Sequence, residues 1–563
     1  MTSIKYSMTK EQQEIFDYSP LNMVITAPAG CGKTEALACR AKGLLERYDF
    51  SRNGRKLLVV SFTNQARDNI YGRIKKYVSV QTLRQYVDIY NFHGLAARII
   101  RAHGNVIGVD GDWTIASSDW VGKCVYSLNC EKKIKNQIKS ALQKIKLECV
   151  TDDEVNQKVQ EIGESIGKYV RFVERKRIEA KIITYDDQIR IALWILQNKR
   201  VAKLYRNHFF AALVDEFQDL TSQQLLLIQI LCGNNVTFAG DLAQGIYSFA
   251  GADAEATFRE ITKRNGKQVE LLKSFRSSPA VLDAVNSLSS RTAGKHLVSA
   301  FPEHWGDGGL SSYASFEDEN AEAEKIAQIC QLILKHCPSS RIGIISRTAF
   351  RAKTFKDVFA AQGISFIDWG DGLFSSGVVR ILRKICDYLP NVPREEWRDS
   401  IGQYVLAANV SASEELKEAI EWLYDQLLQL DTPDFCDIKK RINVRKGNET
   451  VATCKGIHCL TGHAGKGQQF DWVIIVGLEQ GTIPFYKAES LEEKNEEARV
   501  LSVMISRARI GFMATSAMVN PYGRRRSESE FLYYLKTSNM FLFGQDKINR
   551  WFDNADWSTI VQM

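Results

Sequence analysis

Two short stretches place side chains that can handle phosphate and water directly after apolar runs. The first, APAGCGKT at residues 27–34, follows the apolar run NMVITA and precedes a helical pattern. Small residues let the backbone wrap around a phosphate group, while amide hydrogens at the start of the helix face its negative charge. Lys33 is expected to reach the β- and γ-phosphates of a nucleotide, and the hydroxyl of Thr34 to bind Mg²⁺. The predicted nucleotide-binding loop consists of Ala27, which stands where glycine is usual, and of Pro28, Ala29, Gly30, Cys31, Gly32, Lys33 and Thr34.

The second stretch, ALVDEFQDL at residues 212–220, ends an apolar run in three acids and an amide. Asp215 falls at the predicted strand end, where it can hold Mg²⁺ through a water molecule. Glu216 can orient or deprotonate an attacking water. Gln218 does not titrate near neutrality, but its amide can donate and accept hydrogen bonds at once, which suits a sensor. Asp219 precedes TSQQLLLIQIL and is expected to help start that helix.

Short runs rich in Val, Ile and Leu must position these side chains. Each run is followed by polar or Gly-rich residues and then by a helical pattern, and continuous apolarity is typical of parallel strands covered by helices on both faces. Two sets of runs predict two α/β units, with ligands beyond the carboxyl ends of the strands. The runs are 22–27, 56–62, 210–216 and 236–241 in the first half, and 269–275, 341–346, 471–478 and 511–517 in the second.

Helical patterns interrupt both units. Residues 105–185 include the lysine-rich run EKKIKNQIKSALQKIK at 131–146, which is either a solvated basic face or a phosphate-contacting one. We predict an α/β fold with helical insertions. Its parts are a first domain at 1–104 and 186–268, a helical insertion at 105–185, a second domain at 269–374 and 451–563, and a reduced helical accessory insertion at 375–450.

Composition sets outer limits on location and partners. The 563 residues carry 12 cysteines without a C-x-x-C pair, which fits a reducing cytoplasm better than a disulfide framework. The polar start MTSIKYSMTKEQQ lacks the apolar core of a signal peptide, and no apolar run approaches the roughly 20 residues of a membrane span. A net charge of +8 permits a nucleic-acid partner. Cys454, His458, Cys459 and His463 have zinc-ligand chemistry, but their spacing resembles no standard zinc module.

Along nearly the whole chain, stretches in order resemble the motifs of superfamily 1 DNA helicases of the UvrD/Rep/PcrA type. The resemblance implies two RecA-like parallel-sheet motor domains of the P-loop NTPase class, which use ATP and Mg²⁺. Besides APAGCGKT and DEFQD, the matching stretches are MTKEQQEIF (8–16), VVSFTNQARDNIYGRI (59–74), YNFHGLAARIIRAHG (90–104), AGDLAQGIYSFAGA (239–252), LLKSFRSSPAVLDAVN (271–286), LTGHAGKGQQFDWVIIVGLEQGTIP (460–484) and EEARVLSVMISRARIGF (496–512).

The resemblance assigns roles around the nucleotide. Gln12 would read the adenine, Phe275 would stack on it, and Gln218 would link nucleotide state to the DNA side. The implied catalytic set is Lys33, Asp215, Glu216, Gln244 at the γ-phosphate, and Arg276 and Arg507 closing on the transferring phosphoryl group; Gly467 and Gln469 would also bind nucleotide. The chain departs from the family pattern at Glu35, where arginine is common, at Gln469, where glutamate is common, and at Asn91 and Ala250.

Single-stranded nucleic acid is held by stacking on aromatic rings together with backbone contacts. Phe62, Tyr247 and Phe249 follow predicted strands in motifs where the family stacks bases, whereas Phe92 is interpreted as core. The remaining predicted DNA contacts are Asn64, His93 and His463. By resemblance, movement along DNA is 3′→5′.

Three functional hypotheses follow. The leading one is an ATP-dependent single-stranded DNA translocase or helicase acting on single strands or tailed duplexes. Because the accessory insertion is short, the chain also resembles helicase-like subunits of anti-phage systems such as Gabija, so the second is an anti-phage or repair subunit that works with a separate nuclease and unwinds weakly alone. The third is a non-catalytic nucleic-acid-binding scaffold with a relic ATP site, which the intact Lys33, Asp215, Glu216, Arg276 and Arg507 disfavour.

Overall fold

The computed structural model divides the chain into two compact units. One consists of Met1–Pro28 and Gly32–Leu271, and the other of Ala29–Cys31 and Leu272–Met563. None of the helices in the described ranges is long and apolar enough to cross a membrane. The structure describes residues 8–51, 54–62, 64–116, 120–246, 251, 253–264, 266–348, 351–369, 376–393, 396–397, 400–402, 416, 420, 423, 435, 454–462, 468–521 and 523–562.

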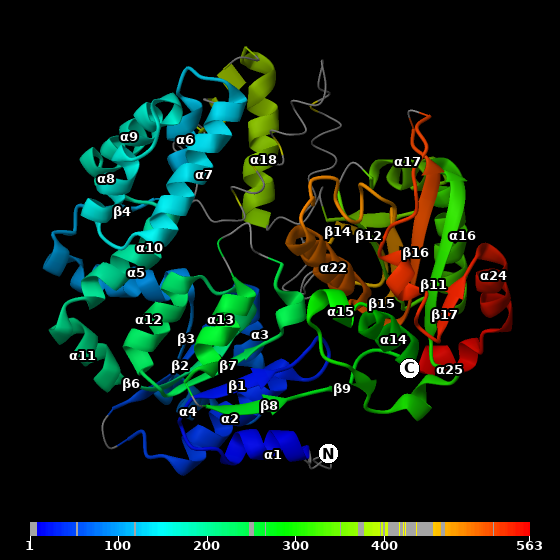
Figure 1. Cartoon of the computed structure of the whole chain (residues 1–563), viewed down its shortest axis with the longest axis horizontal. Coiled ribbons are helices and arrows are strands. Elements are labelled where there is room, and N and C mark those ends of the chain that lie inside the picture. The colour runs from blue at the N-terminus through cyan, green and yellow to red at the C-terminus, as the bar shows by residue number, and fades with distance from the viewer. Residues whose placement is uncertain are drawn as a thin grey trace. The chain divides into compact units, whose positions relative to one another are not determined.

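A parallel sheet forms the centre of the first unit, with strand order β3-β2-β6-β7-β1-β8 (Figure 1). Its strands are Val-, Leu- and Ala-rich and almost wholly buried, as the continuous apolar runs predict. Their bounds are β1 (Met23–Thr26), β2 (Lys56–Ser61), β3 (Val87–Asn91), β6 (Phe209–Asp215), β7 (Val236–Gly240) and β8 (Lys267–Glu270).

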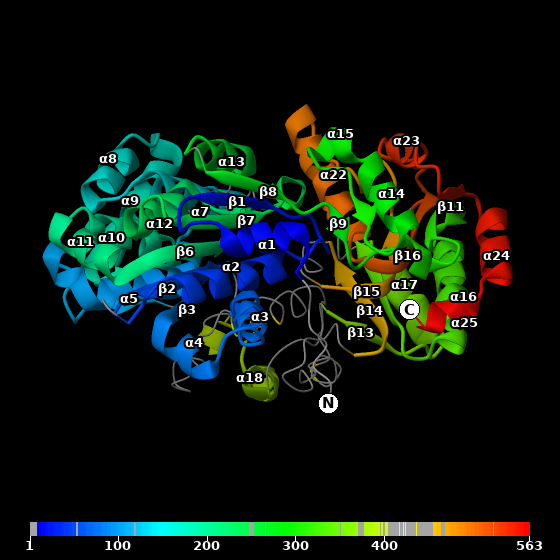
Figure 2. The ribbon, with the colours of Figure 1, turned by 90° about the horizontal axis from the view of Figure 1, so that it is seen from below.

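Helices cover both faces of this sheet, because successive strand residues point to opposite sides. In β7, the Thr237 hydroxyl accepts a hydrogen bond from Arg40 of helix α2, whereas the next residue, Phe238, packs into the core on the other face. Figure 2 shows the sheet strands among these helices. Helix α2 (Lys33–Arg47) contacts both α1 (Lys10–Asp17) and α3 (Asn64–Ile74). Helices α5 (Phe92–His103), α10 (Tyr185–Leu196) and α12 (Ser222–Cys232) share the core that contains Phe238.

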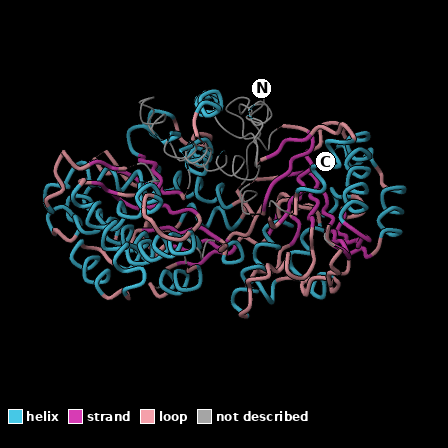
Figure 3. The backbone as a smooth tube through the Cα atoms, turned by 90° about the horizontal axis from the view of Figure 1, so that it is seen from above, coloured by secondary structure: helices cyan, strands magenta, loops and turns pink. Residues whose placement is uncertain are grey.

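The second unit is built on a larger parallel sheet, with strand order β13-β14-β12-β15-β16-β11-β17. Figure 3 draws the strands in magenta. Helices α16 (Glu319–His336), α17 (Lys353–Ala361), α24 (Gln545–Asn554) and α25 (Trp557–Gln562) contribute to its core, and α14 (Pro279–Ser287) and α22 (Leu491–Ile505) pack against β16. The strands are β11 (Leu310–Asp318), β12 (Arg341–Ser346), β13 (Phe366–Asp368), β14 (Gly456–Thr461), β15 (Phe470–Val476), β16 (Ala508–Val519) and β17 (Phe541–Phe543). The two parallel sheets confirm the predicted α/β class.

Strand assignment differs from the sequence prediction at one important place. The run 269–275 was assigned to the second half, but its first part belongs to β8, which pairs with β1 of the first sheet. Its last part forms β9 (Lys273–Ser274), which pairs in parallel with β10 (Val298–Ser299). One apolar run therefore contains the end of one unit and the start of the next. Strands β3, β11 and β14 have mixed sequences that form no continuous apolar run, so they were not predicted.

Helices fill most of residues 105–185, with a short parallel pair of strands, β4 (Thr114–Ile115) and β5 (Ile182–Ile183), at the two ends. The helices α6 (Trp120–Tyr126), α7 (Lys132–Glu148), α8 (Asp152–Gln160) and α9 (Glu164–Glu179) enclose an apolar cluster of their own. In the region 375–450, α18 (Ser376–Tyr388) packs on the described side chains of Trp397, Ile401, Leu416 and Leu423. Apart from residues 389–393, 396, 400, 402, 420 and 435, the rest of the predicted accessory insertion lies outside the described residues.

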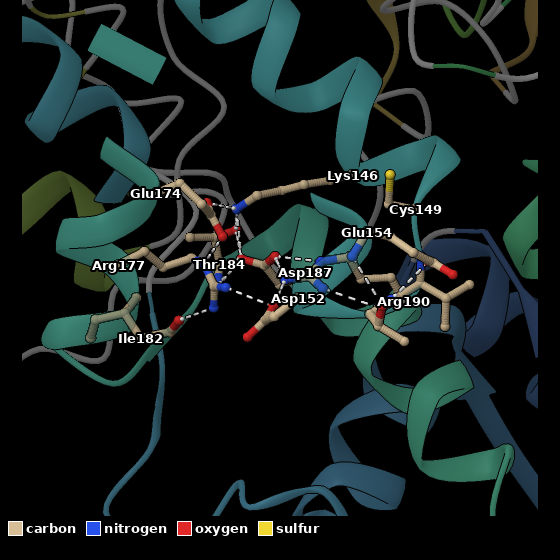
Figure 4. Close-up of polar contacts among 12 residues, drawn as sticks. Lys146, Cys149, Asp152, Glu154, Glu174, Arg177, Ile182, Thr184, Asp187 and Arg190 are labelled. Atoms are coloured by element: carbon tan, nitrogen blue, oxygen red, sulfur yellow. Dashed lines mark hydrogen bonds and ion pairs between the residues drawn. The ribbon is translucent and has the colours of Figure 1, made fainter. Parts of the chain in front are cut away.

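Within the first unit, a buried ion network joins the helices of 105–185 to helix α10 (Figure 4). Lys146 of α7 pairs with Glu174 of α9 at 3.2 Å and with Asp187 of α10 at 2.8 Å. Arg190 also pairs with Asp187, and Arg177 pairs with Glu174 at 2.6 Å. Arg177 and Arg190 both reach Asp152 of α8, at 2.8 and 2.7 Å. Three cations thus meet three acids, which satisfies the requirement that buried charges be paired.

The network corrects the interpretation of the lysine-rich run. Exposed Lys133 and Lys144 fit a solvated face. Lys146, however, is 1% exposed and neither solvated nor available to a phosphate. Burial alone would raise the pKa of Asp187, but Arg190, Lys146 and Arg177 outweigh it and hold that pKa well below its ordinary value. One lysine of the run is therefore structural, which composition alone does not reveal.

Replacing Asp187 with alanine is expected to lower the free energy of unfolding by about 3–5 kcal/mol, because Lys146 and Arg190 would keep buried charges without their acid. Urea-induced unfolding followed by circular dichroism would measure the change. Arg175→Ala is the matched control: this side chain forms an exposed pair with Glu179, so the loss should stay below about 1 kcal/mol. Equal effects of the two substitutions would contradict the buried-network interpretation.

Candidate functional site

The predicted phosphate loop links β1 to α2 in the conformation that its glycines allow. The amide of Ala27 donates to the carbonyl of Gly240 at 2.9 Å, which fixes the start of the loop to the end of β7. Gly30 and Gly32 both have φ of +84°, a left-handed conformation that favours glycine. Gly32 also precedes the first residue of α2, Lys33. The loop therefore ends at a helix N-terminus, the feature that suits an anion.

Lys33 lies between the two acids that follow β6. Its ammonium forms ion pairs with Glu216 and, at 3.7 Å, with Asp215. Burial by itself would lower the pKa of Lys33, but Glu216 and Asp215 outweigh it and raise that pKa above its ordinary value. Burial raises the pKa of Asp215 to about 6, with the neighbouring Glu216 adding to the effect. The structure thus brings together three of the predicted catalytic side chains; their roles stay predictions.

Glu216 has an unusual backbone. Its φ of +57° and ψ of +51° place a residue with a side chain in the left-handed region. Such a conformation costs on the order of 1–3 kcal/mol and tends to occur at functional sites. The amide of Glu216 donates to the Asp215 carboxylate at 3.0 Å, which helps to hold the turn. The conformation directs Glu216 to Lys33 and Gln218 immediately after the strand.

Gln218 connects Glu216, which follows β6, with Asp241, which follows β7. Its amide nitrogen donates to Glu216 at 2.6 Å, and its oxygen accepts from the backbone amide of Asp241 at 3.0 Å. Asp241 in turn accepts from the side chain of Gln244 at 2.8 Å. A Cβ at Gly240 would lie 2.4 Å from the Gln218 oxygen, so this glycine makes room for the link. The amide uses its donor and acceptor simultaneously, as its chemistry predicts.

Asp241 is a residue of this site that is absent from the predicted catalytic set. It is buried at the end of β7, burial raises its pKa, and its charge contributes to the raised pKa of Lys33. A signal was present in the sequence, because the apolar run VTFAGD ends in this acid. Asp219, by contrast, does not start α12. Thr221 is the N-cap residue and forms a capping box with Gln224.

The residues predicted to hold Mg²⁺ offer oxygen donors, which that ion prefers. Thr34 is in the first turn of α2, and Asp215 ends β6 next to Lys33 of the same turn. Glu35, on the same turn, departs from the family pattern, and it pairs with Arg73 of α3 at 3.1 Å. A hydroxyl and a carboxylate fit the ion, and the assignment stays a prediction.

Gln12 is fixed by its own helix. Its side-chain oxygen accepts from the amide of Thr9 at 3.0 Å in a capping box, and the side chain is buried. Arg40 of α2 donates to the carbonyls of Ile15, Tyr18 and Ser19, which tie the end of α1 to the helix that follows the phosphate loop. The helix of the predicted adenine-reading residue is therefore anchored to the helix that follows the predicted phosphate loop.

Four predicted nucleotide contacts of the second unit have distinct environments. The Phe275 ring is 49% exposed, and its amide donates at 3.0 Å to the carbonyl of Gly30, which belongs to the same compact unit. Burial lowers the pKa of Arg276 to about 10, which leaves it cationic at neutral pH. Arg507 follows α22, is buried, and donates to the Val503 carbonyl and the Ser506 hydroxyl. Gln469 is exposed just before β15.

Among the predicted DNA contacts, His93 is the best defined. Its ring stacks on Tyr185 with centroids 3.6 Å apart, and burial lowers its pKa to about 4, so it is neutral at physiological pH. Phe62 is half-buried directly after β2, and Asn64 begins α3. Phe92 lies in the core, as interpreted from the sequence, and Asn91 caps α5 through Gly94. Tyr247, Phe249, Ala250, His463 and Gly467 lie outside the described residues.

One histidine of the zinc alternative, His458, is engaged in other contacts. One ring nitrogen of His458 accepts from the indole of Trp369 at 3.3 Å, and the other lies 2.8 Å from the carbonyl of Cys454. Burial lowers the pKa of His458. Both ring nitrogens therefore have partners within the protein, and the ring belongs to the packing beside β14.

Comparison with known proteins gives a consistent result. The UvrD/REP helicase N-terminal domain family matches residues 8–264, and the UvrD-like helicase C-terminal domain family matches residues 384–516. The chain is 22% identical to the ATP-dependent DNA helicase PcrA of Staphylococcus epidermidis over 654 aligned positions, covering 98% of this chain and 86% of that protein. It is 24% identical to the ATP-dependent DNA helicase UvrD2 of Mycobacterium tuberculosis over 570 positions, covering 90% and 78%.

Proposed function

Since the chain belongs to the UvrD/REP helicase family, we propose that it is an ATP-dependent DNA helicase that moves 3′→5′ along single-stranded DNA. The observation that carries the proposal is the continuous polar chain from Lys33 through Glu216, Gln218 and Asp241 to Gln244. It joins the helix after the phosphate loop to the ends of two adjacent strands. A change at the phosphates therefore has a hydrogen-bonded route to the motif that begins at Asp241.

In this proposal each side chain acts on ATP in a defined way. Lys33 exchanges its acid partners for the β- and γ-phosphates, which frees Glu216 to orient and deprotonate the attacking water. Thr34 and Asp215 would hold Mg²⁺, which would supply positive charge beside the phosphate oxygens. Arg276 and Arg507 stabilise the charge that spreads over the transferring group, and Gln244 reads the γ-phosphate.

The binding roles follow the same logic. Gln12 and Phe275 recognise the adenine, and Gly467 and Gln469 complete the nucleotide contacts. On the DNA side, neutral His93 and half-buried Phe62 offer rings to the bases, since stacking does not depend on base identity. Tyr247, Phe249, Asn64 and His463 are proposed as further contacts. We also propose that the two motor domains occupy 1–104 with 186–268, and 269–374 with 451–563.

A strand-displacement assay with 3′- and 5′-tailed duplexes tests the proposal. The purified chain should hydrolyse ATP faster when single-stranded DNA is added, and it should displace strands only from the 3′-tailed substrate. Lys33→Ala protein serves as the catalytic control and should do neither. Unwinding only from 5′ tails would overturn the polarity, and ATPase activity indifferent to DNA would overturn the motor function.

A second candidate function is favoured by segments of the staphylococcal PcrA that have no counterpart within this chain. Alignment with the staphylococcal PcrA extends over 654 positions although this chain has 563 residues, so the relative contains segments that this chain lacks. A chain with a shortened accessory insertion suits a helicase-like subunit that works with a separate nuclease in anti-phage defence or repair. Co-purification of a nuclease with the tagged chain from its native host would support this candidate. Processive unwinding by the isolated chain would count against it.

A further inference from the structure

An exposed array of aromatic rings lies around Phe275 in the second unit. The Phe301 ring meets Phe275 edge-on, with centroids 5.9 Å apart and planes at 65°. On its other side, Phe301 stacks on His304 at 5.2 Å. Phe275 and Phe301 are 49% and 47% exposed, so the pair keeps large apolar surface in contact with solvent. Contiguous exposed rings of this kind are typical of a binding surface.

Strand pairing explains why these rings meet. In the parallel pair β9–β10, Lys273 is opposite Val298 and Ser274 is opposite Ser299. The amide of Ala300 also donates to the carbonyl of Ser274 at 2.8 Å, which extends the pairing by one step. Phe275 and Phe301 directly follow these paired segments, so the two residues lie close together. The short helix η5 (Pro302–Trp305) then turns the chain so that His304 reaches the Phe301 ring.

The array is attached to the phosphate loop by backbone contacts. The amide of Phe275 donates to the carbonyl of Gly30, and a Cβ at Gly30 would lie 2.8 Å from the Cβ of Arg276 and 2.9 Å from the Ser274 hydroxyl. The loop is thus closely packed against the segment that carries the Phe275 ring. A purine attached to phosphates at this loop is the flat, apolar partner for which the array is suited.

We propose that Phe301 is a positioning residue for the nucleobase of ATP: its edge-on contact holds the Phe275 ring in the orientation that stacks on the base. The inference rests on the proposed ATP-dependent function and adds a residue to it. Edge-to-face ring pairs are worth about 0.5–1.5 kcal/mol, which corresponds to roughly two- to tenfold in affinity. Because Phe301 is half-exposed and outside the cores described above, its removal should leave the fold intact.

Binding measured by titration calorimetry with Mg²⁺ tests this role. Phe301→Ala should weaken ATPγS binding by about two- to tenfold and leave binding of inorganic tripolyphosphate, which has no base, unchanged. Phe301→Tyr should bind ATPγS as the wild type does. Val298→Ala is the matched control, since Val298 is also exposed on β10 but is not part of the ring array. In a Phe275→Ala background, Phe301→Ala should cause no further loss.

Several results would overturn the inference. An unchanged ATPγS affinity in Phe301→Ala, an equal loss for tripolyphosphate, or a full additional loss in the Phe275→Ala background would each do so. A loss confined to single-stranded DNA binding would assign the array to the nucleic acid instead and reject the ATP role. If the wild type itself binds no ATPγS, the proposed ATP-dependent function fails, which is a distinct outcome.

Discussion

Glu216→Gln protein is expected to hydrolyse ATP about 10²–10⁴-fold more slowly than the wild type, because an amide cannot accept the proton of the attacking water. Nucleotide binding should change little, since glutamine has the same shape and can still accept the hydrogen bond from Gln218. Single-turnover hydrolysis and an independent ATPγS binding titration would separate the two effects. A loss of binding equal to the loss of hydrolysis would show that Glu216 acts in nucleotide affinity instead.

A matched substitution controls for the loss of an acid as such. Glu14→Gln removes a carboxylate of the same unit that pairs with Lys267 at the surface. Its turnover should equal that of the wild type. If Glu216→Gln also retained full turnover, the assignment of the base would be wrong.

Arg507→Ala protein is expected to lose about 10³-fold or more in kcat, in line with the removal of an arginine that stabilises a transferring phosphoryl group. Arg507 is buried, so the alanine variant tests folding as well as catalysis. Arg507→Lys keeps a positive charge but not the planar fork of donors, and it should also show a large loss. Steady-state kinetics at saturating ATP and DNA, together with circular dichroism, would measure both properties.

Arg509→Lys is the control, two residues further along the chain in β16. The Arg509 guanidinium pairs with Asp471 at 2.9 Å, an interaction that a lysine can replace in part. This variant should retain nearly wild-type kcat. A well-folded Arg507→Lys variant with unreduced kcat would remove Arg507 from the catalytic set.

The sequence predicted most of the first sheet because buried parallel strands have continuous apolar runs. The same logic placed Lys33, Asp215 and Glu216 together, since each comes directly after a run and the strand ends meet at one edge of the sheet. The apolar runs alone do not predict that β6 and β7 are neighbours in the sheet. The link from Gln218 to Asp241 therefore became visible only in the structure.

Other features could not be predicted from the sequence because they depend on partners distant in the chain. Lys146 looks like its solvent-facing neighbours in α7, and only Glu174 and Asp187 show that it is buried. Strand β8 could not be separated from β9, because the sequence has no turn residue between them and pairing with β1 decides the matter. Asp219 and Thr221 are both good cap residues, and the capping box with Gln224 selects the threonine.

The left-handed backbone at Glu216 costs folding stability at the residue that is proposed to activate the attacking water. Glycine adopts this conformation without steric cost, so Glu216→Gly would remove the strain at the end of β6 together with the carboxylate. The same substitution would leave Lys33 without its nearer acid partner and Gln218 without an acceptor, so the strain relieved is set against two lost contacts.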